Sequence, residues 1–293
     1  MNGINILALG GDARAIYMCE QLAQRYSVTV CRLPVRPEGT SAVSKPEDMP
    51  SKADALILPM LTGVRHTADG SFLPCGLEVI SLERLLPVLR DGAPVLGGLA
   101  DSETVSLFES AGHPFEDYFK RRELTVRNCI PTAEGALMIA MQEQAETVFG
   151  SSVLVIGFGN VGKASARLFA AAGAEVSCAV RRADAAAEAE SAGYAPLMMP
   201  ELAESISRFD TVINTVPALV LDEPLLEAMK PKALIIDLAS LPGGVDKAAA
   251  EALGVRLVHA LALPGKVAPV TAGRYIADTV TNILTERGVG NVT

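Results

Sequence analysis

The stretch that decides the fold is VLVIGFGNVGKASARLFAAAG, residues 153–173. An apolar run leads into a turn of the form Gly-x-Gly-x-x-Gly, and the residues after it have the periodicity of a helix. Gly157 allows a tight turn out of the strand, Gly159 lets a pyrophosphate approach the backbone, and Gly162 lets the helix pack close to the sheet. A further strand at 175–180 completes a βαβ unit. The stretch therefore predicts a dinucleotide-binding unit whose helix N-terminus attracts phosphate.

The first predicted cofactor contacts are the residues of this turn, namely Gly157, Phe158, Gly159, Asn160, Val161 and Gly162. A glycine-rich turn also occurs in proteins that bind no nucleotide. A βαβ unit without a cofactor is therefore the alternative interpretation.

Two arginines, Arg181 and Arg182, come where the second strand ends. Enzymes that bind NAD carry an acidic side chain at this place, which accepts hydrogen bonds from the ribose 2′-hydroxyl. No acid ends this strand, and guanidinium groups bind phosphate in a bidentate fork. We therefore predict that the cofactor is NADP, held at its 2′-phosphate by the two arginines. The alternative is a solvated turn that happens to be basic.

Two later strand ends complete the predicted cofactor site. The turn at 215–217 would lie over the cofactor ribose, although an ordinary strand-ending turn has the same pattern. The turn at 237–244 is rich in glycine and proline, which suits backbone lying close to the nicotinamide, with Ser240 as the reachable hydroxyl. The contacts expected in these two turns are Thr215, Val216, Pro217, Asp237 and Ala239.

The rest of the chain reads as strands and helices in alternation on both sides of a long helix, which Pro131 and Thr132 open and Gly150 closes. This long helix is expected at 131–149. Before it we expect strands at 4–9, 27–31, 55–59 and 93–96, helices at 13–26, 81–89 and 102–111, and a surface connection at 34–50. After it we expect strands at 153–156, 175–180, 211–214, 233–237 and 256–259 and a final helix at 271–287.

This pattern predicts an α/β protein with two Rossmann-like, doubly wound parallel-sheet domains joined by the long helix. The C-terminal helix is expected to return to the first domain. The predicted substrate domain comprises residues 1–130 together with 271–293, and the predicted NADP-binding domain comprises 131–270.

Composition restricts the classes of protein to which the chain can belong. Its 293 residues carry a formal net charge of −9, which argues against nucleic acid as a partner because such binding needs clustered Lys and Arg. The five cysteines are scattered without Cys-x-x-Cys spacing and are expected to be reduced thiols rather than a metal site. The N-terminus reads as a first strand rather than a signal peptide, and no apolar run is long enough to cross a bilayer. We expect a cytoplasmic protein that contains no metal.

Residues that act on a substrate are expected mainly at the strand ends of the first domain. Asp12 and Arg14 belong to the strand-to-helix turn GGDAR at 10–14, where Arg14 could clamp a carboxylate. A surface arginine paired with a neighbouring acid is the alternative. The other catalytic candidates are Thr62, which follows the strand at 55–59, Ser240, and Glu134, expected on the first turn of the long helix, where a carboxylate also simply suits the helix dipole.

Motifs in both domains resemble a known family. The domain order, the turn at 157–162 and the stretch DLAS at 237–240 are similar to the superfamily of D-2-hydroxyacid dehydrogenases and adenosylhomocysteinase. The family of dipicolinate synthase A subunits, from spore-forming bacteria, is a closer match. That resemblance covers the whole chain and rests on GGDAR at 10–14, IPTAEG at 130–135, NTVP at 214–217, DLASLPGG at 237–244 and LPGKVAP at 263–269.

The resemblance implies a reaction in which 4-hydroxy-tetrahydrodipicolinate and NADP⁺ give dipicolinate, NADPH and water. It also implies that the partner is a flavoprotein-like B subunit, that the substrate is a small dicarboxylate, and that the location is the cytoplasm of the mother cell of a sporulating bacterium. Because the product is an aromatic pyridine, the protein need only hold the ring against the nicotinamide and move protons.

Three positions depart from related patterns. Ser240 stands where hydroxyacid dehydrogenases carry an arginine, and the loop at 263–265 lacks their histidine. Leu241 stands where a basic residue is expected in some close relatives within the family. Two alternatives remain open, an NADP-dependent oxidoreductase of another keto or hydroxy acid and a non-catalytic nucleotide-binding subunit. The sequence is also compatible with a homodimer formed through the cofactor domain.

Overall fold

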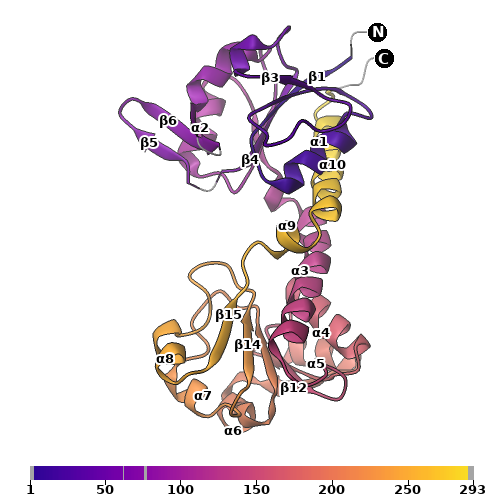
Figure 1. Ribbon diagram of the computed structural model, residues 1–293, viewed down its shortest axis with the longest axis vertical. Coiled ribbons are helices and arrows are strands. Elements are labelled where there is room, and N and C mark those ends of the chain that lie inside the picture. The colour runs from indigo at the N-terminus through magenta and orange to yellow at the C-terminus, as the bar shows by residue number, and fades with distance from the viewer. Residues whose placement is uncertain (1–2, 62, 76–77, 290–293) are drawn as a thin grey trace. The chain divides into compact units, whose positions relative to one another are not determined.

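The computed structural model describes residues 3–61, 63–75 and 78–289, which form two compact units (Figure 1). Unit 1 consists of Met1–Arg127 and Ala268–Thr293, and unit 2 consists of Asn128–Val267. The predicted division, at 130/131 and 270/271, lies three residues away from each of these crossings. Each unit contains a six-stranded parallel sheet covered by helices, which confirms the predicted α/β class.

The parallel sheet of unit 1 has the strand order β3-β2-β1-β4-β8-β9. Its strands are β1 (Asn5–Leu9), β2 (Ser27–Cys31), β3 (Ser41–Val43), β4 (Ala55–Met60), β8 (Val95–Gly98) and β9 (Phe115–Asp117). The chain crosses to the other half of the sheet between β1 and β4, so their carboxyl ends form the switch point where ligands bind in this fold class. A separate antiparallel sheet consists of β5 (Arg65–Thr67), β6 (Gly70–Cys75) and β7 (Glu78–Ser81).

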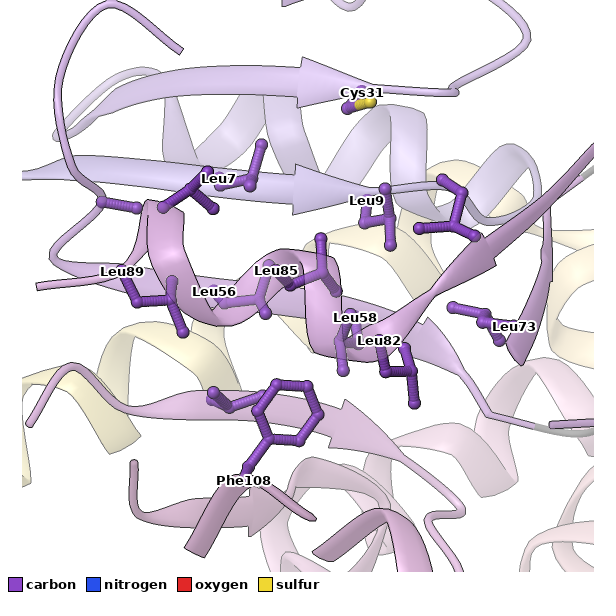
Figure 2. Close-up of a cluster of buried hydrophobic side chains, with 14 of the residues drawn as sticks. Leu7, Leu9, Cys31, Leu56, Leu58, Leu73, Leu82, Leu85, Leu89 and Phe108 are labelled. Atoms are coloured by element: carbon purple, nitrogen blue, oxygen red, sulfur yellow. The ribbon is translucent and has the colours of Figure 1, made fainter. Parts of the chain in front are cut away.

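Side chains of the central strands alternate between two cores, one on each face of the unit 1 sheet. Leu7 and Leu9 of β1 point into the cluster shown in Figure 2, while Ile6 and Ala8 point to the opposite face. The helices and 3₁₀ turns that cover these faces are α1 (Ala13–Leu22), η1 (Pro46–Asp48), η2 (Leu82–Val88), α2 (Ser102–Ser110), η3 (Tyr118–Lys120) and α10 (Pro269–Glu286).

The C-terminal helix α10 packs on unit 1, as predicted from the sequence. Its residues Ile276, Val280 and Ile283 are buried with Ile6 and Met18 in the second core. Gly273 lies so close to α1 that a Cβ there would stand 2.5 Å from a backbone oxygen of that helix. The last helix is therefore an integral layer of the first unit.

Unit 2 repeats the arrangement with the order β12-β11-β10-β13-β14-β15. Its strands are β10 (Ser152–Ile156), β11 (Glu175–Val180), β12 (Ala195–Met198), β13 (Thr211–Asn214), β14 (Leu234–Asp237) and β15 (Arg256–His259). The connecting helices and turns are α4 (Asn160–Ala171), α5 (Ala183–Ser191), η4 (Met199–Glu201), α6 (Leu202–Ser205), η5 (Ile206–Arg208), α7 (Glu223–Glu227), α8 (Lys247–Ala252) and α9 (Leu263–Val267). The switch point of this sheet lies between β10 and β13.

The long helix α3 (Arg122–Glu143) begins nine residues before the predicted start at Pro131 and ends six residues before Phe149. Proline lacks an N–H and normally opens a helix or breaks it, which is why the sequence suggests a start there. In the structure Pro131 lies inside the helix. The hydroxyl of Thr132 donates to the carbonyl oxygen of Asn128, one turn earlier in the same helix, at 2.7 Å.

Other elements also differ from the sequence-based expectation. The first helix ends at Leu22 rather than at residue 26, because the backbone tightens into turns in which the carbonyl of Leu22 accepts from two N–H groups. The expected helix at 81–89 is a 3₁₀ turn, with Pro87 inside it. The sequence does not predict β3, β9 and β12, or the antiparallel sheet β5-β6-β7.

Candidate functional site

The turn after β10 has the geometry of a phosphate-binding loop. Gly157 has a φ of +90°, and a Cβ there would stand 2.6 Å from the Oγ1 of Thr215. A Cβ on Gly162 would stand 2.0 Å from the carbonyl oxygen of Gly157, so only glycine lets α4 begin this close to the strand end. A Cβ on Gly159 would meet no atom within 4 Å. The space beside Gly159 is therefore open to an incoming pyrophosphate.

The N-terminus of α4 is free to bind an anion. Gly159 is its N-cap, and no side chain caps its first N–H groups. Phe158 is buried against Tyr194, with ring centroids 6.0 Å apart, and fixes the middle of the turn. Asn160 is exposed on the first helical turn, and Val161 is half-buried. These features fit the pyrophosphate of a dinucleotide, and the residues of the turn would hold it.

The turn that follows β13 lies against the glycine turn. The hydroxyl of Thr215 donates to the carbonyl oxygen of Ile156 at 2.8 Å, and its N–H donates to the same oxygen at 3.0 Å. The side chain of Val216 would come within 2.9 Å of a Cβ at position 157, and Pro217 is exposed. The structure thus brings together two of the three turns that the sequence assigns to the cofactor.

The third turn, 237–244, is held by a buried carboxylate. Asp237 is fully buried, and its carboxylate accepts from Asn214 at 2.8 Å, from the N–H of Ala239 at 3.1 Å and from the N–H of Gly244 at 3.0 Å. These bonds leave Asp237 a positioning residue, which connects the ends of β13 and β14. Ser240 is exposed at the outer part of the turn.

The two arginines predicted to bind the 2′-phosphate differ in their surroundings. The N–H of Gly157 donates to the carbonyl of Ala179 at 2.9 Å, so the end of β11 lies beside the glycine turn. Arg181 and Arg182 are both exposed there. The Nε of Arg182 donates to Asp184 at 2.9 Å, and this hydrogen bond lowers the pKa of the Asp184 carboxyl. The sequence-based prediction does not include Asp184, although an acid two residues after an arginine at a helix start is a readable signal.

A second candidate site is a cavity of about 260 Å³ in unit 1, at the carboxyl ends of β1 and β4. Gly10 and Gly11, which form its floor, have φ values of +54° and +117°. A Cβ on Gly11 would stand 2.6 Å from the Cβ of Ala15, so glycine is required for the helix to start here. The predicted anion-binding turn therefore lines a real cavity at the switch point of its sheet.

Asp12 and Arg14 are the only charged side chains among the described residues that line this cavity. Arg14 is almost fully buried, whereas Asp12 is half-exposed. The Nε and Nη2 of Arg14 donate to the Asp12 carboxylate at 3.0 Å and 2.6 Å, and its backbone N–H donates to the same group at 2.9 Å. Burial opposes ionisation of Asp12, but these bonds to Arg14 outweigh it and lower the carboxyl pKa. Asp12 is thus ionised at neutral pH and orients the guanidinium rather than donating a proton.

The remaining wall is formed by residues that the sequence does not identify. The Nη2 of Arg14 also donates to the sulfur of Met60 at 3.4 Å, and the hydroxyl of Tyr118 donates to the carbonyl of Leu58 at 3.1 Å. Burial raises the pKa of the Cys75 thiol to about 11, so this wall is uncharged at neutral pH. An anion in the cavity would find the Arg14 guanidinium, held by the Asp12 carboxylate, beside a wall that is uncharged at neutral pH.

The catalytic candidates come from both units. Asp12 and Arg14 belong to unit 1, whereas Glu134 and Ser240 belong to unit 2. Glu134 is not on the first turn of a helix, because α3 begins twelve residues earlier, and the helix-dipole explanation of its carboxylate is therefore wrong. Thr62 lies outside the described residues.

Two features are absent from the described part of the chain. No group of three or more His, Cys, Asp or Glu side chains within residues 3–61, 63–75 and 78–289 could hold a metal ion. Within the same residues, no helix has both the length and the apolar character needed to span a bilayer.

Comparison with known proteins gives a family match for each of two parts of the chain. Residues 5–119 match the family model of the N-terminal domain of the dipicolinate synthase A subunit, and residues 132–263 match that of the NAD-binding domain of D-isomer-specific 2-hydroxyacid dehydrogenases. The dipicolinate synthase A subunit of Bacillus subtilis (strain 168) is 33% identical over 292 residues, which cover 98% of this chain and 97% of the relative. The chain belongs to the family of dipicolinate synthase A subunits.

Solved structures of this family have the same fold. The dipicolinate synthase A subunit of Bacillus halodurans superposes with a TM-score of 0.86 at 30% identity, over 96% of this chain and 98% of the other. Its Bacillus subtilis counterpart gives 0.85 at 31% identity, over 98% and 97%. A transhydrogenase from Sinorhizobium meliloti, at 18% identity and a TM-score of 0.72, shares the fold alone.

Family membership and the matched dehydrogenase domain make the chain an oxidoreductase of the dehydrogenase type with a nicotinamide cofactor. The relatives are named as one lettered component of a synthase, which implies that those proteins work with at least one other subunit. NAD and NADP are not distinguished by these matches.

Proposed function

We propose that this chain is the dehydrogenase subunit that forms dipicolinate from 4-hydroxy-tetrahydrodipicolinate with NADP⁺ as the oxidant. The observation that carries the proposal is the cavity at the β1/β4 switch point, where the guanidinium of Arg14 is the only positive group among the described residues. A small ring that bears two carboxylates needs a fixed cation, and this one is already oriented by Asp12.

The size and chemistry of the cavity suit one end of such a substrate. Arg14 would hold one carboxylate, and backbone N–H groups of the turn at 10–12 would assist it. The apolar wall formed by Met60, Cys75 and Tyr118 suits the face of a carbon ring. Because the Nε and Nη2 of the arginine already bond to Asp12, little side-chain entropy is lost when substrate binds.

The reaction consumes one substrate and one NADP⁺ and yields dipicolinate, NADPH, one proton and water. Elimination of the 4-hydroxyl group as water adds a ring double bond, and loss of a hydride and a proton then completes the aromatic ring. The bound nicotinamide supplies the hydride acceptor. The protein orients the ring, excludes water and moves protons, and the exposed Glu134 and Ser240 are the proposed groups for proton transfer.

Unit 2 would hold the coenzyme. Its pyrophosphate would lie beside Gly159 at the uncapped N-terminus of α4, and the 2′-phosphate would lie at Arg181 and Arg182. The turns that begin at Thr215 and Asp237 would support the ribose and nicotinamide. The proposed partner is a flavoprotein-like B subunit, with both chains present in the active enzyme.

The test is a reconstituted reaction. Purified chain, with and without the B subunit, is supplied with 4-hydroxy-tetrahydrodipicolinate and either NADP⁺ or NAD⁺. We expect the ultraviolet absorption of a pyridine dicarboxylate to appear at the same rate as NADPH, with one molecule of each formed per turnover. We also expect the reaction to depend on Arg14. Coenzyme binding without any product in the presence of both subunits would instead support a non-catalytic nucleotide-binding role, and turnover of other hydroxy acids alone would support a different dehydrogenase.

A further inference from the structure

The subsite proposed for the 2′-phosphate already contains an anion of the protein itself. The carboxylate of Asp184 accepts from the Nε of Arg182 at 2.9 Å and from the N–H of Ala185, on the first turn of α5, at 2.8 Å. A phosphate at this place would use the same two kinds of donor, a guanidinium and the N–H groups of a helix N-terminus. The Asp184 side chain thus stands where a phosphate oxygen would bind.

Both members of this pair are accessible. The side chain of Arg182 is 75% exposed and that of Asp184 is 69% exposed, so the pair can open without any change in the core. Arg181, the neighbouring cation, has no ion pair among the described residues. The two arginines are therefore unequal, since one is free to meet a phosphate and the other is neutralised by its own chain.

We propose that Asp184 competes with the 2′-phosphate of NADP for Arg182 and so lowers the preference of this chain for NADP over NAD. The inference rests on the coenzyme site of the proposed function. Binding of NADP has to break the pair and place a phosphate close to a carboxylate, whereas NAD brings only a 2′-hydroxyl and leaves the pair intact. Asp184 can accept a hydrogen bond from that hydroxyl, as the acidic residue does in enzymes that bind NAD.

The expected effect is moderate, because exposed charge pairs are screened by solvent. Removal of the charge of Asp184 should tighten NADP⁺ binding about five-fold. Two effects contribute, because one exposed ion pair no longer has to be broken and a negative charge near the phosphate is gone. The affinity for NAD⁺ should fall or stay within about two-fold. The change in selectivity should shrink as the salt concentration rises, since the interactions are at the surface.

The test is titration calorimetry of the full-length chain with NADP⁺ and NAD⁺ at low and high salt. The variant Asp184→Asn removes the charge at constant shape, and Asp184→Ser keeps an oxygen acceptor for the helix N-terminus if the first variant folds poorly. The control is Glu190→Gln, which changes net charge equally on the same helix at an exposed acid. We expect only the two Asp184 variants to raise the ratio of NADP⁺ to NAD⁺ affinity.

An unchanged ratio in folded Asp184 variants, or the same rise in Glu190→Gln, would overturn the inference and leave the proposed reaction standing. Wild-type chain that binds neither coenzyme would overturn both the inference and the coenzyme site. If the ratio of NADP⁺ to NAD⁺ affinity rises but the chain forms no dipicolinate with its partner present, the inference is supported and only the proposed reaction is contradicted.

Discussion

The turns after β1 and β10 occupy equivalent places in two similar sheets, yet their surroundings differ. Each begins with a glycine at positive φ, Gly10 or Gly157, whose N–H donates to the neighbouring strand, at 2.8 Å to Cys31 and at 2.9 Å to Ala179. The helices that follow these turns differ in their N-cap residue. Gly159 leaves the start of α4 open, whereas Asp12 caps α1 with its side chain.

This difference would suit the two turns to the two kinds of ligand proposed for them. An uncapped helix with open space beside it admits an extended phosphate chain along the backbone. A capped helix whose capping acid also orients a buried arginine borders a cavity of about 260 Å³, which suits a small anion. The residue at the helix N-cap therefore separates the proposed coenzyme turn from the proposed substrate turn.

The largest expected effect comes from Gly162→Ala in the coenzyme turn. The added Cβ would stand 2.0 Å from the carbonyl oxygen of Gly157, which is backbone and cannot move aside cheaply. We expect the free energy of unfolding to fall by about 3 kcal/mol and coenzyme binding to be lost. Thermal unfolding followed by circular dichroism, together with calorimetry, measures both. Wild-type stability in this variant would mean that the turn and α4 are not in close contact.

The next effect concerns the substrate turn. Arg14→Gln removes the only cation among the described residues of the cavity, and we expect the affinity for dipicolinate, used as a product ligand, to fall about 100-fold because a buried charge-assisted contact is lost. The affinity for the coenzyme should not change, since that turn belongs to unit 2. Arg84→Gln, at a highly exposed arginine, is the control. Unchanged dipicolinate binding would place the carboxylate site elsewhere.

A smaller effect is expected from Gly159→Ala, the partner experiment to Gly162→Ala. The Cβ enters open space, so the unfolding temperature should equal that of the wild type. It would occupy the volume proposed for the pyrophosphate, and coenzyme affinity should fall about ten-fold. Calorimetry and thermal unfolding on the same samples give both values. If NADP⁺ binds this variant as tightly as the wild type, the pyrophosphate does not pass here.

The smallest effect is a dependence on pH that only the substrate turn should have, because the turn at 157–162 has no ionisable side chain. The pKa of Asp12 lies below its ordinary value of 3.8, so its charge stabilises the fold at neutral pH, and this contribution is lost as the pH falls through the folded-state pKa. Asp12→Asn keeps the helix cap and should cost at most about 1 kcal/mol at pH 7, since half of the side chain is exposed to screening solvent.

Urea unfolding of the wild type and Asp12→Asn at a series of pH values checks this expectation. The difference in unfolding free energy should vanish in acid. A difference that is constant with pH would show that the Asp12 charge is not what holds Arg14.

The strands that could be predicted from the sequence are mainly those in the interior of the two sheets. β1, β4 and β10 are buried along most of their length and therefore read as nearly continuous apolar runs. The three parallel strands that could not be predicted, β3, β9 and β12, all lie at sheet edges, where a strand is short and one side is unpaired. β12 even contains Pro196, which is tolerated there because no neighbour needs its N–H.

The candidate sites show a similar limit. The glycines at 157, 159 and 162 could be identified because their role depends on local backbone geometry. Cys75 and Tyr118 reach the cavity of unit 1 from distant parts of the chain, and the hydroxyl of Tyr118 bonds to a carbonyl 60 residues away. No local pattern marks such residues. Asp184 differs from them, because it is only two residues from Arg182, its partner in the structure, and this local pattern could have been noted in the sequence.

The return of α10 to unit 1 has a consequence for how the chain is made. Unit 2 is continuous in sequence and can fold while the ribosome is still adding residues, but the second core of unit 1 lacks Ile276, Val280 and Ile283 until the final helix emerges. The earliest-synthesised domain is thus the last to be completed. A nascent or truncated chain that ends before residue 268 would expose an apolar surface on α1 and β1, and it would be a target for chaperones and proteases.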